Sequence, residues 1–188
     1  MKNISHIRKT LRVFTVVWLA LAAPAFAGEV ALGPGSVLWL EGDSTLHAYS
    51  STATAMEVSG EWSDDLSVKD FQLAVPVEGL KSGKAGLDKN MYEALRAKEY
   101  PAIRFRIQTI EAGEGLSIAA AGTLSLAGAE RKVELKAQGT RTGNGLRIRG
   151  REELRMSDFG IKPPAMLMGA VKTRDKVIVH YDIVLIVR

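Results

Sequence analysis

The residue types that could do chemistry fall in two short segments of the chain. His47 follows a polar segment, residues 43–45, which contains an aspartate, a serine and a threonine. A serine nucleophile needs its base within hydrogen-bond reach and an oxyanion hole beside it. Side chains of an extended segment alternate between two faces, so these residues cannot readily converge. We expect no catalytic residue here and a hydrogen-bonding role at a rim; a hydrolase or isomerase that uses His47 is the less favoured alternative.

His180 and Asp182 are a conceivable pair of metal ligands, because residues two apart in a strand share a face. Two ligands do not complete a zinc site, and the chain has no cysteine that could supply a thiolate. A hydrogen-bonded strand histidine is the simpler interpretation, so we expect neither a metal ion nor another cofactor. The lack of cysteine also excludes disulfides and a lipid-anchored cysteine.

The N-terminal segment has the pattern of a secretory signal peptide. Four basic residues and no acidic one lie within residues 1–12, and an almost wholly apolar run follows from Val13 to Ala23. This run is shorter than the roughly 20 residues that a membrane-spanning helix needs. Small residues at Ala25 and Ala27 suit cleavage after Ala27. We therefore expect residues 1–27 to be a cleaved signal peptide and residues 28–188 to be one domain, exported to the periplasm.

The net charge of +4 belongs to the signal peptide. Residues 28–188 retain 21 Lys and Arg, since four of the 25 are removed, against 21 Asp and Glu. A neutral domain has little long-range attraction for phosphate backbones. Basic stripes at residues 104–106 and 147–151 have no aromatic residues on the same face for base stacking, so a solvated outer strand face is the favoured interpretation. We expect no nucleic-acid partner.

Alternating apolar and polar residues predict strands along nearly the whole domain. Period-2 patterns or apolar runs cover residues 36–41, 53–60, 71–77, 103–107, 116–126, 132–138, 146–151 and 177–187. Only residues 88–99 suit a helix, with Asp88 as the N-cap and Tyr100-Pro101 as its end. About eight strands with one helix predict an antiparallel sheet that closes into a barrel or forms a sandwich. The positions of Trp39 and Trp62, in the core or at a rim, are left open.

Four motifs in the same order resemble the YceI-like family. They are residues 42–47 (GDSTLH), residues 87–105 with their Tyr-Pro-x-Ile-x-Phe sequence, residues 122–133 (GTLSLAG and RKV), and residues 157–161 (SDFGI). The resemblance implies an all-β fold: an eight-stranded antiparallel lipocalin-like barrel with one short helix over a mouth. It also implies a long amphiphilic ligand, a polyisoprenoid in particular, with its tail inside the barrel.

One departure from the family pattern concerns the head group of the ligand. The family often has an Arg-Asp pair at the start of the helix, whereas Leu87 precedes Asp88 here. A phosphate contact is then missing or supplied by Lys84 or Lys89. An apolar or amphiphilic ligand in general is therefore better supported than one with a pyrophosphate.

The inward faces of the predicted strands supply the candidate ligand-binding residues. Small residues at Ala120, Gly122 and Ala137 leave volume that an alkyl chain could fill, and each buried methylene contributes about 0.8 kcal/mol. A packed, ligand-free core is the alternative. The candidates, with a lid from the helix and the segment after it, are Phe71, Leu73, Val75, Met91, Tyr92, Leu95, Tyr100, Ile103, Phe105, Ile118, Ala120, Leu124, Leu135 and Ile148.

The favoured function is therefore a non-enzymatic periplasmic carrier for an isoprenoid or other lipid-like amphiphile, secreted and not stably inserted in the membrane after cleavage. A homodimer is left open. The alternative is a structural or interaction module of the cell envelope with a filled barrel.

Overall fold

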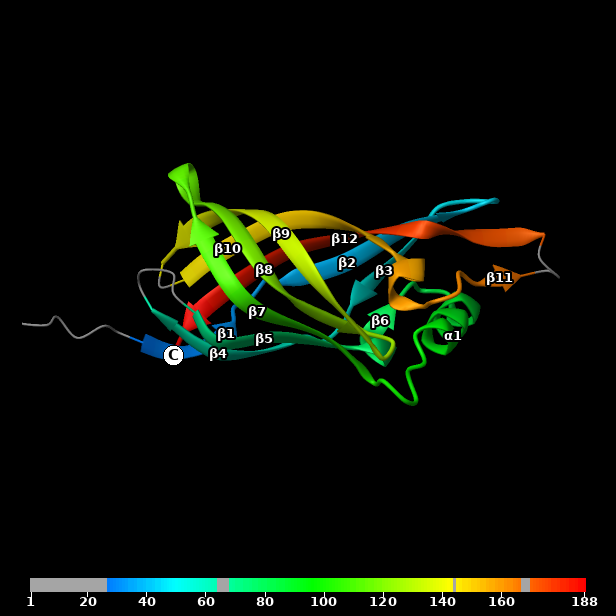
Figure 1. Ribbon diagram of the computed structural model, residues 1–188, viewed down its shortest axis with the longest axis horizontal. Coiled ribbons are helices and arrows are strands. Elements are labelled where there is room, and N and C mark those ends of the chain that lie inside the picture. The colour runs from blue at the N-terminus through cyan, green and yellow to red at the C-terminus, as the bar shows by residue number, and fades with distance from the viewer. Residues whose placement is uncertain (1–26, 64–67, 144, 167–169) are drawn as a thin grey trace, which may run out of the picture.

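The sheet closes into a barrel of eight antiparallel strands, as predicted (Figure 1). The computed structural model describes residues 27–63, 68–143, 145–166 and 170–188. Strand β1 (Ala27–Leu32) pairs with β4 (Glu57–Ser63) on one side and with the end of β12 (Val171–Val187) on the other. The ring between them is completed by β5 (Val68–Pro76), β7 (Ala102–Ala112), β8 (Ser117–Leu126), β9 (Ala129–Thr142) and β10 (Gly145–Arg155).

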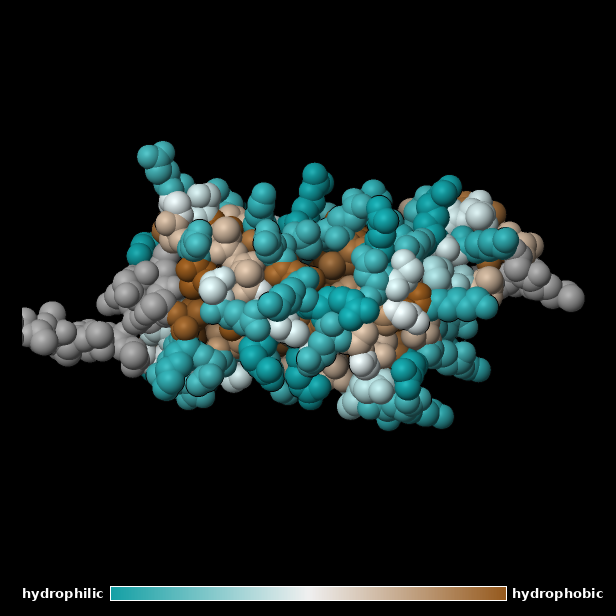
Figure 2. All heavy atoms as spheres, viewed as in Figure 1, coloured by the Kyte–Doolittle hydropathy of each residue, from teal (hydrophilic) through white to brown (hydrophobic). Residues whose placement is uncertain are grey.

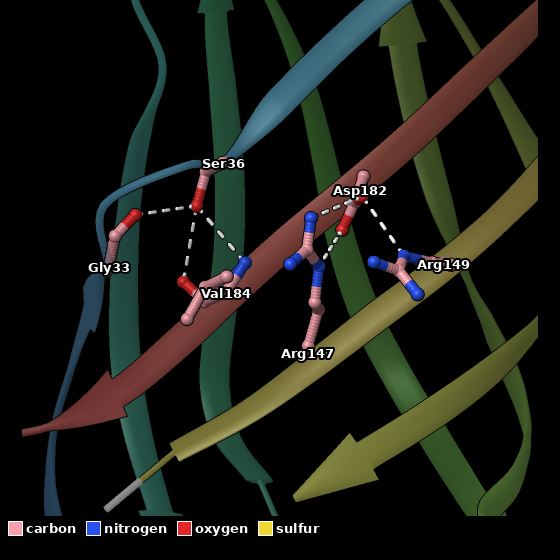
Figure 3. A network of polar contacts seen from close by, with 6 residues as sticks. All are labelled: Gly33, Ser36, Arg147, Arg149, Asp182 and Val184. Carbon is pink, nitrogen blue, oxygen red and sulfur yellow. Dashed lines mark hydrogen bonds and ion pairs between the residues drawn. The ribbon is translucent and has the colours of Figure 1, made fainter. Parts of the chain in front are cut away.

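Three further strands extend the wall toward the helical end. Strand β2 (Val37–Ser44) pairs with β12 beyond the β1 contact, and β3 (Tyr49–Ala53) and β6 (Leu80–Lys81) follow. Ser36 stabilises the connection between β1 and β2. Its hydroxyl donates to the Gly33 carbonyl at 2.8 Å and accepts from the Val184 amide at 3.0 Å (Figure 3). The first two strands therefore follow one path along β12. A two-residue strand, β11 (Ala165–Met166), pairs with the start of β12.

Two strands of more than two residues lack a signal in the sequence. Strand β1 begins at the predicted cleavage site, and β3 has the polar sequence YSSTA, whose inward position Ser51 is buried. The predicted strand at 53–60 spans the interval between β3 and β4. Hydrophobic alternation cannot find a strand whose inward residue is a serine.

The end of the barrel farther from the helix is filled by side chains. The residues buried together there are Val30, Trp62, Phe71, Ile118, Leu146, Ile183 and Leu185. Trp62 therefore belongs to the core. Trp39 instead lies on the outer wall, where its ring stacks on His180 with the ring centroids 4.7 Å apart. Packing at this end closes one mouth of the barrel and holds β1, β4 and β12 together.

Helix α1 (Ala85–Ala94) lies at the other mouth (Figure 1). The prediction of Asp88 as its N-cap is wrong, because the helix begins three residues earlier. The Asp88 carboxylate accepts from the Ser82 amide at 2.8 Å and from the Ser82 hydroxyl at 2.5 Å, and these bonds lower its pKa. Asp88 thus fixes the loop that leads into the helix.

The helix also ends earlier than predicted, before the Tyr-Pro pair. Arg96 has a φ of 54°, a left-handed conformation, and its amide donates to the Glu93 carbonyl at 3.1 Å. The Ala97 amide donates to the Tyr92 carbonyl at 2.9 Å. These two bonds form a Schellman motif, which most often has glycine where this chain has arginine. The sequence therefore carries no glycine signal for this helix end.

The arginine stripe on β10 lies on the outer wall, as predicted. Arg147 binds Asp182 through two hydrogen bonds of 2.6 and 2.7 Å, and Arg149 adds a third of 3.0 Å (Figure 3). These bonds lower the pKa of Asp182. Hydrophilic side chains cover much of the face in Figure 2, with hydrophobic ones between them. Asp182 thus neutralises part of the stripe and joins β10 to β12.

We predict that Asp182→Asn lowers the urea midpoint of unfolding at pH 7. Because the folded-state pKa of Asp182 lies below its ordinary value of 3.8, its stabilising effect is complete above that value and is lost as the pH falls through the folded pKa. Wild type and variant should therefore converge in acid. Glu153→Gln, at an exposed pair with Lys176, is the matched control and should leave the midpoint nearly unchanged. A difference that persists in acid would contradict the prediction.

Candidate functional site

A mainly apolar cavity of about 320 Å³ lies inside the barrel beneath α1. Its volume is in the range of small-molecule pockets. Alternate residues of the strands line its wall. At the mouth the lining includes Leu87, Met91 and Ala94 of α1 and Leu95, the residue after the helix. The segment that follows β10 adds Phe159 and Ile161 at the rim. The cavity thus lies between the packed core on one side and the helix on the other.

Twelve of the fourteen candidate residues line this cavity. They are Phe71, Leu73, Val75, Met91, Leu95, Ile103, Phe105, Ile118, Ala120, Leu124, Leu135 and Ile148. The alternation of apolar and polar residues predicted that the strand members of this set face inward. Closure of the sheet brings their side chains into one lumen. Their contact with a ligand remains a prediction.

The other two candidates, Tyr92 and Tyr100, lie outside the cavity lining. The Tyr92 hydroxyl contacts the Leu80 carbonyl at 2.7 Å and accepts from Lys81 Nζ at 3.0 Å. Tyr92 therefore attaches α1 to the barrel wall. The Tyr100 ring covers Gly128, where it leaves no room for a Cβ, and the Arg96 guanidinium lies 4.7 Å from the ring centroid. Helical periodicity could not show which face of α1 points to the lumen.

Aromatic rings inside the barrel lie along the wall. Phe105 covers Gly122 on the neighbouring strand, and a Cβ on that glycine would overlap the ring. Tyr49 covers Gly42 and Tyr181 covers Gly150 in the same manner. Glycines in strand interiors make room for such rings. The rings therefore bury their faces without filling the centre, and Ala120 and Ala137 leave further space.

The cavity wall also carries polar side chains that escaped the sequence prediction, among them Ser51 and Glu152. Burial raises the pKa of Glu152 and of Tyr49, and it raises the pKa of Tyr181 to about 12. The Tyr181 hydroxyl donates to the Lys136 carbonyl at 3.2 Å. Ser51 is 1% exposed, and its hydroxyl has no hydrogen-bond partner among the described residues. Continuing the alternation from Ile148 through Gly150 would have placed Glu152 inside.

The polar segment around His47 forms the turn between β2 and β3 at the mouth. The Ser44 hydroxyl donates to the His47 carbonyl at 2.8 Å and accepts from the His47 amide at 3.1 Å. Asp43 pairs with Arg174 at 3.1 Å. The serine hydroxyl thus stabilises the turn and is bonded to the backbone of His47, whereas a triad would need its imidazole.

His180 and Asp182 have separate partners on the outer wall. His180 Nε2 lies 3.1 Å from Glu41 Oε2, whereas Asp182 binds two arginines. Within the described ranges, no group of three His, Cys, Asp or Glu side chains could hold a metal ion. Lys84 and Lys89 do not line the cavity; Lys89 pairs with Glu93 at 4.0 Å. Arg155, at the end of β10, is the one Lys or Arg among the described lining residues.

Comparison with known proteins identifies one family. Residues 39–185 match the model of the YceI-like domain. Among solved structures, BcnA of Burkholderia cenocepacia has a TM-score of 0.68 at 15% identity, covering 79% of this chain and 95% of its own. A polyisoprenoid-binding domain from Saccharophagus degradans, implicated in plant cell wall breakdown, has a TM-score of 0.65 at 13% identity, covering 87% and 99%.

The YCEI protein of Campylobacter jejuni also shares the fold, with a TM-score of 0.57 at 12% identity, covering 97% of this chain and 91% of its own. No curated protein has a significantly similar sequence. At these identities the solved structures establish a common barrel architecture.

We predict that Tyr92→Phe loosens the helix over the cavity. The change removes the hydroxyl that contacts the Leu80 carbonyl and accepts from Lys81, at a cost of about 1 kcal/mol for one net hydrogen bond. Amide hydrogen exchange in α1 should become about fivefold faster. Amides of β8 and β9 serve as the internal control and should not change. Unchanged exchange in α1 would show that the hydroxyl does not hold the helix.

Proposed function

This chain belongs to the YceI-like family, and from that premise we propose that it is an exported carrier that holds an isoprenoid or other lipid-like amphiphile inside its barrel. The observation that carries the proposal is the apolar cavity of about 320 Å³ between the packed core and α1. Burial of an alkyl chain there contributes about 0.8 kcal/mol per methylene. The polyisoprenoid-binding domain of Saccharophagus degradans has the same fold, which supports an isoprenoid as the ligand.

The alternative module with a filled barrel fits the structure less well. Side chains fill the end of the barrel around Trp62 and Leu146, and beside them a cavity of about 320 Å³ remains in the lumen. A carrier also needs no catalytic group. The engagement of the Ser44 hydroxyl by the backbone of His47 favours the non-enzymatic role.

Export to the periplasm is part of the same proposal. The predicted signal peptide lies outside the described residues, apart from Ala27, with which β1 begins. The barrel therefore starts directly at the predicted cleavage site. No helix in the described part of the chain is long and apolar enough to cross a membrane.

The test of the carrier function is extraction of lipid from protein purified from its native envelope. Mass spectrometry should find an amphiphile in a near-stoichiometric amount. Ala120→Trp places a large ring in the cavity and should reduce the bound amount at least tenfold. Ala119→Trp adds the same ring on the exposed face of the same strand, so it is the matched control and should keep the ligand. Equal lipid in both variants, or none in the wild type, would refute the proposal.

Export and cleavage are tested by measuring the mass of the protein. The protein isolated from the periplasm should have the mass of residues 28–188. A mass that includes the first 27 residues would contradict cleavage after Ala27.

A further inference from the structure

The route into the cavity is limited by the construction of its wall. Most of the wall is sheet, whose strands lie about 4.8 Å apart and are joined by backbone hydrogen bonds that leave no gap for a ligand. Among the described lining residues, those outside the strands belong to three elements: α1 with Leu95, the turn between β2 and β3, and residues 156–164 after β10, here called the rim segment. A ligand therefore enters where these elements meet.

The turn between β2 and β3 is bonded to the start of β12. The Thr45 amide donates to the Lys172 carbonyl at 2.9 Å, and the Lys172 amide donates to the Thr45 hydroxyl at 3.1 Å. The rim segment is bonded to the same strand, because the Thr173 amide donates to the Pro164 carbonyl at 3.0 Å. Strand β12 thus joins the turn to the rim segment, and attention falls on the seam between the rim segment and α1.

An outer groove of about 430 Å³ lies outside this seam. Its walls are the end of α1, the turn between β8 and β9 at residues 127–129, and residues 159–162 of the rim segment, which lie beside one another in Figure 1. Ala94, Phe159 and Ile161 line both the outer groove and the cavity. One layer of side chains therefore separates the two spaces.

Phe159 is the largest side chain in this layer. It is 4% exposed, and so is Ile161, whereas Ala94 contributes only a methyl group. The ring is thus the main obstacle between the outer groove and the lumen. Its displacement would give an apolar chain a continuous path along apolar side chains.

The two sides of the seam are held to different parts of the barrel. Tyr92 attaches α1 to β6. The Ser157 amide and hydroxyl donate to the Asp175 carboxylate at 2.8 and 2.6 Å, and Arg131 Nε donates to the Asp158 carbonyl at 2.8 Å, so the rim segment is held by β12 and β9. Asp175 lines neither the cavity nor the outer groove. It can therefore hold the rim segment without contacting a ligand.

Resting on the carrier function proposed above, we propose that amphiphiles enter and leave the cavity through the outer groove, between α1 and the rim segment, with Phe159 as the gate. Asp175 is a positioning residue that keeps the gate closed through Ser157. The outer groove receives the apolar chain first, and the chain then passes Phe159 and Ile161 into the lumen.

The rates of ligand exchange test this route. All-trans retinol, a fluorescent isoprenoid alcohol, is titrated into purified protein freed of bound lipid to give its dissociation constant. Stopped-flow mixing gives the association rate, and transfer to excess phosphatidylcholine vesicles gives the dissociation rate. A gate residue changes both rates by the same factor, because it acts on a barrier that both directions share. A residue that only contacts the bound ligand changes mainly the dissociation rate.

Asp175→Ala frees the rim segment from its bonds through Ser157. We expect both rates to rise about fivefold and the dissociation constant to stay within twofold of the wild-type value. Asp43→Ala removes the exposed pair with Arg174 beside the turn between β2 and β3, so it is the matched control and should leave both rates unchanged. Faster exchange in the control alone, or equally in both variants, would place the entrance elsewhere on the rim and refute the proposal.

Phe159→Leu keeps an apolar side chain at the gate but narrows it. Both rates should rise about threefold, again without a change in the dissociation constant. Phe105→Leu, on the strand wall away from the outer groove, is the comparison and should raise the dissociation rate alone. If Phe159→Leu also raises only the dissociation rate, Phe159 is a cavity contact and not a gate.

The outcomes distinguish the two proposals. If retinol does not bind the wild type, the carrier function for isoprenoids fails, and the entrance fails with it. If retinol binds and both Asp175→Ala and Phe159→Leu leave the two rates unchanged, the carrier function stands and entry through the outer groove is refuted.

Discussion

The double pairing of β12 is the constraint on which the rest of the structure depends. This strand is hydrogen-bonded to β10 along one side and to β2 and then β1 along the other. A closed sheet has no free edge, and its inward side chains must share one enclosed space. The closure puts residues from both ends of the chain into one wall, with Val30 in the packed core and Leu185 in both core and cavity. Without it there would be neither core nor cavity.

Closure alone does not decide whether a barrel is filled or hollow. Here a cluster of buried side chains around Trp62 and Leu146 packs one end of the lumen, and the cavity lies between that cluster and α1. Phe105 and Tyr181 lie flat over glycines of neighbouring strands, so their bulk contributes to the wall and leaves the centre open. Helix α1 closes the hollow end, and it is held from outside by Tyr92 and from its first loop by Asp88. The compartment therefore results from a few side-chain orientations within a common architecture.

Much of this arrangement could be predicted from alternation. The inward face of β8, with Ile118, Ala120 and Leu124, was identifiable because every second residue is apolar or small, and the barrel followed from the number of strands and the family motifs. Strand β3 and the polar groups Ser51 and Glu152 were missed for one reason: an inward polar residue breaks the pattern that identifies a strand face. The limits of α1 shifted because Asp88 bonds to a preceding loop and Arg96 adopts a conformation that usually requires glycine.

The sequence by itself determined the class of protein: a neutral, cysteine-free all-β domain behind a signal-like segment, with an inward set of apolar residues. The period of two is a local property, set by the backbone of a single strand, and it can be read without knowing the neighbours. Only the tertiary structure decided that Tyr92 and Tyr100 face away from the lumen, that Asp182 partly neutralises the arginine stripe, and that Ser51 and Glu152 share one row of the cavity wall. Those relations join residues far apart in the chain, so they depend on strand order and register, which no local pattern contains.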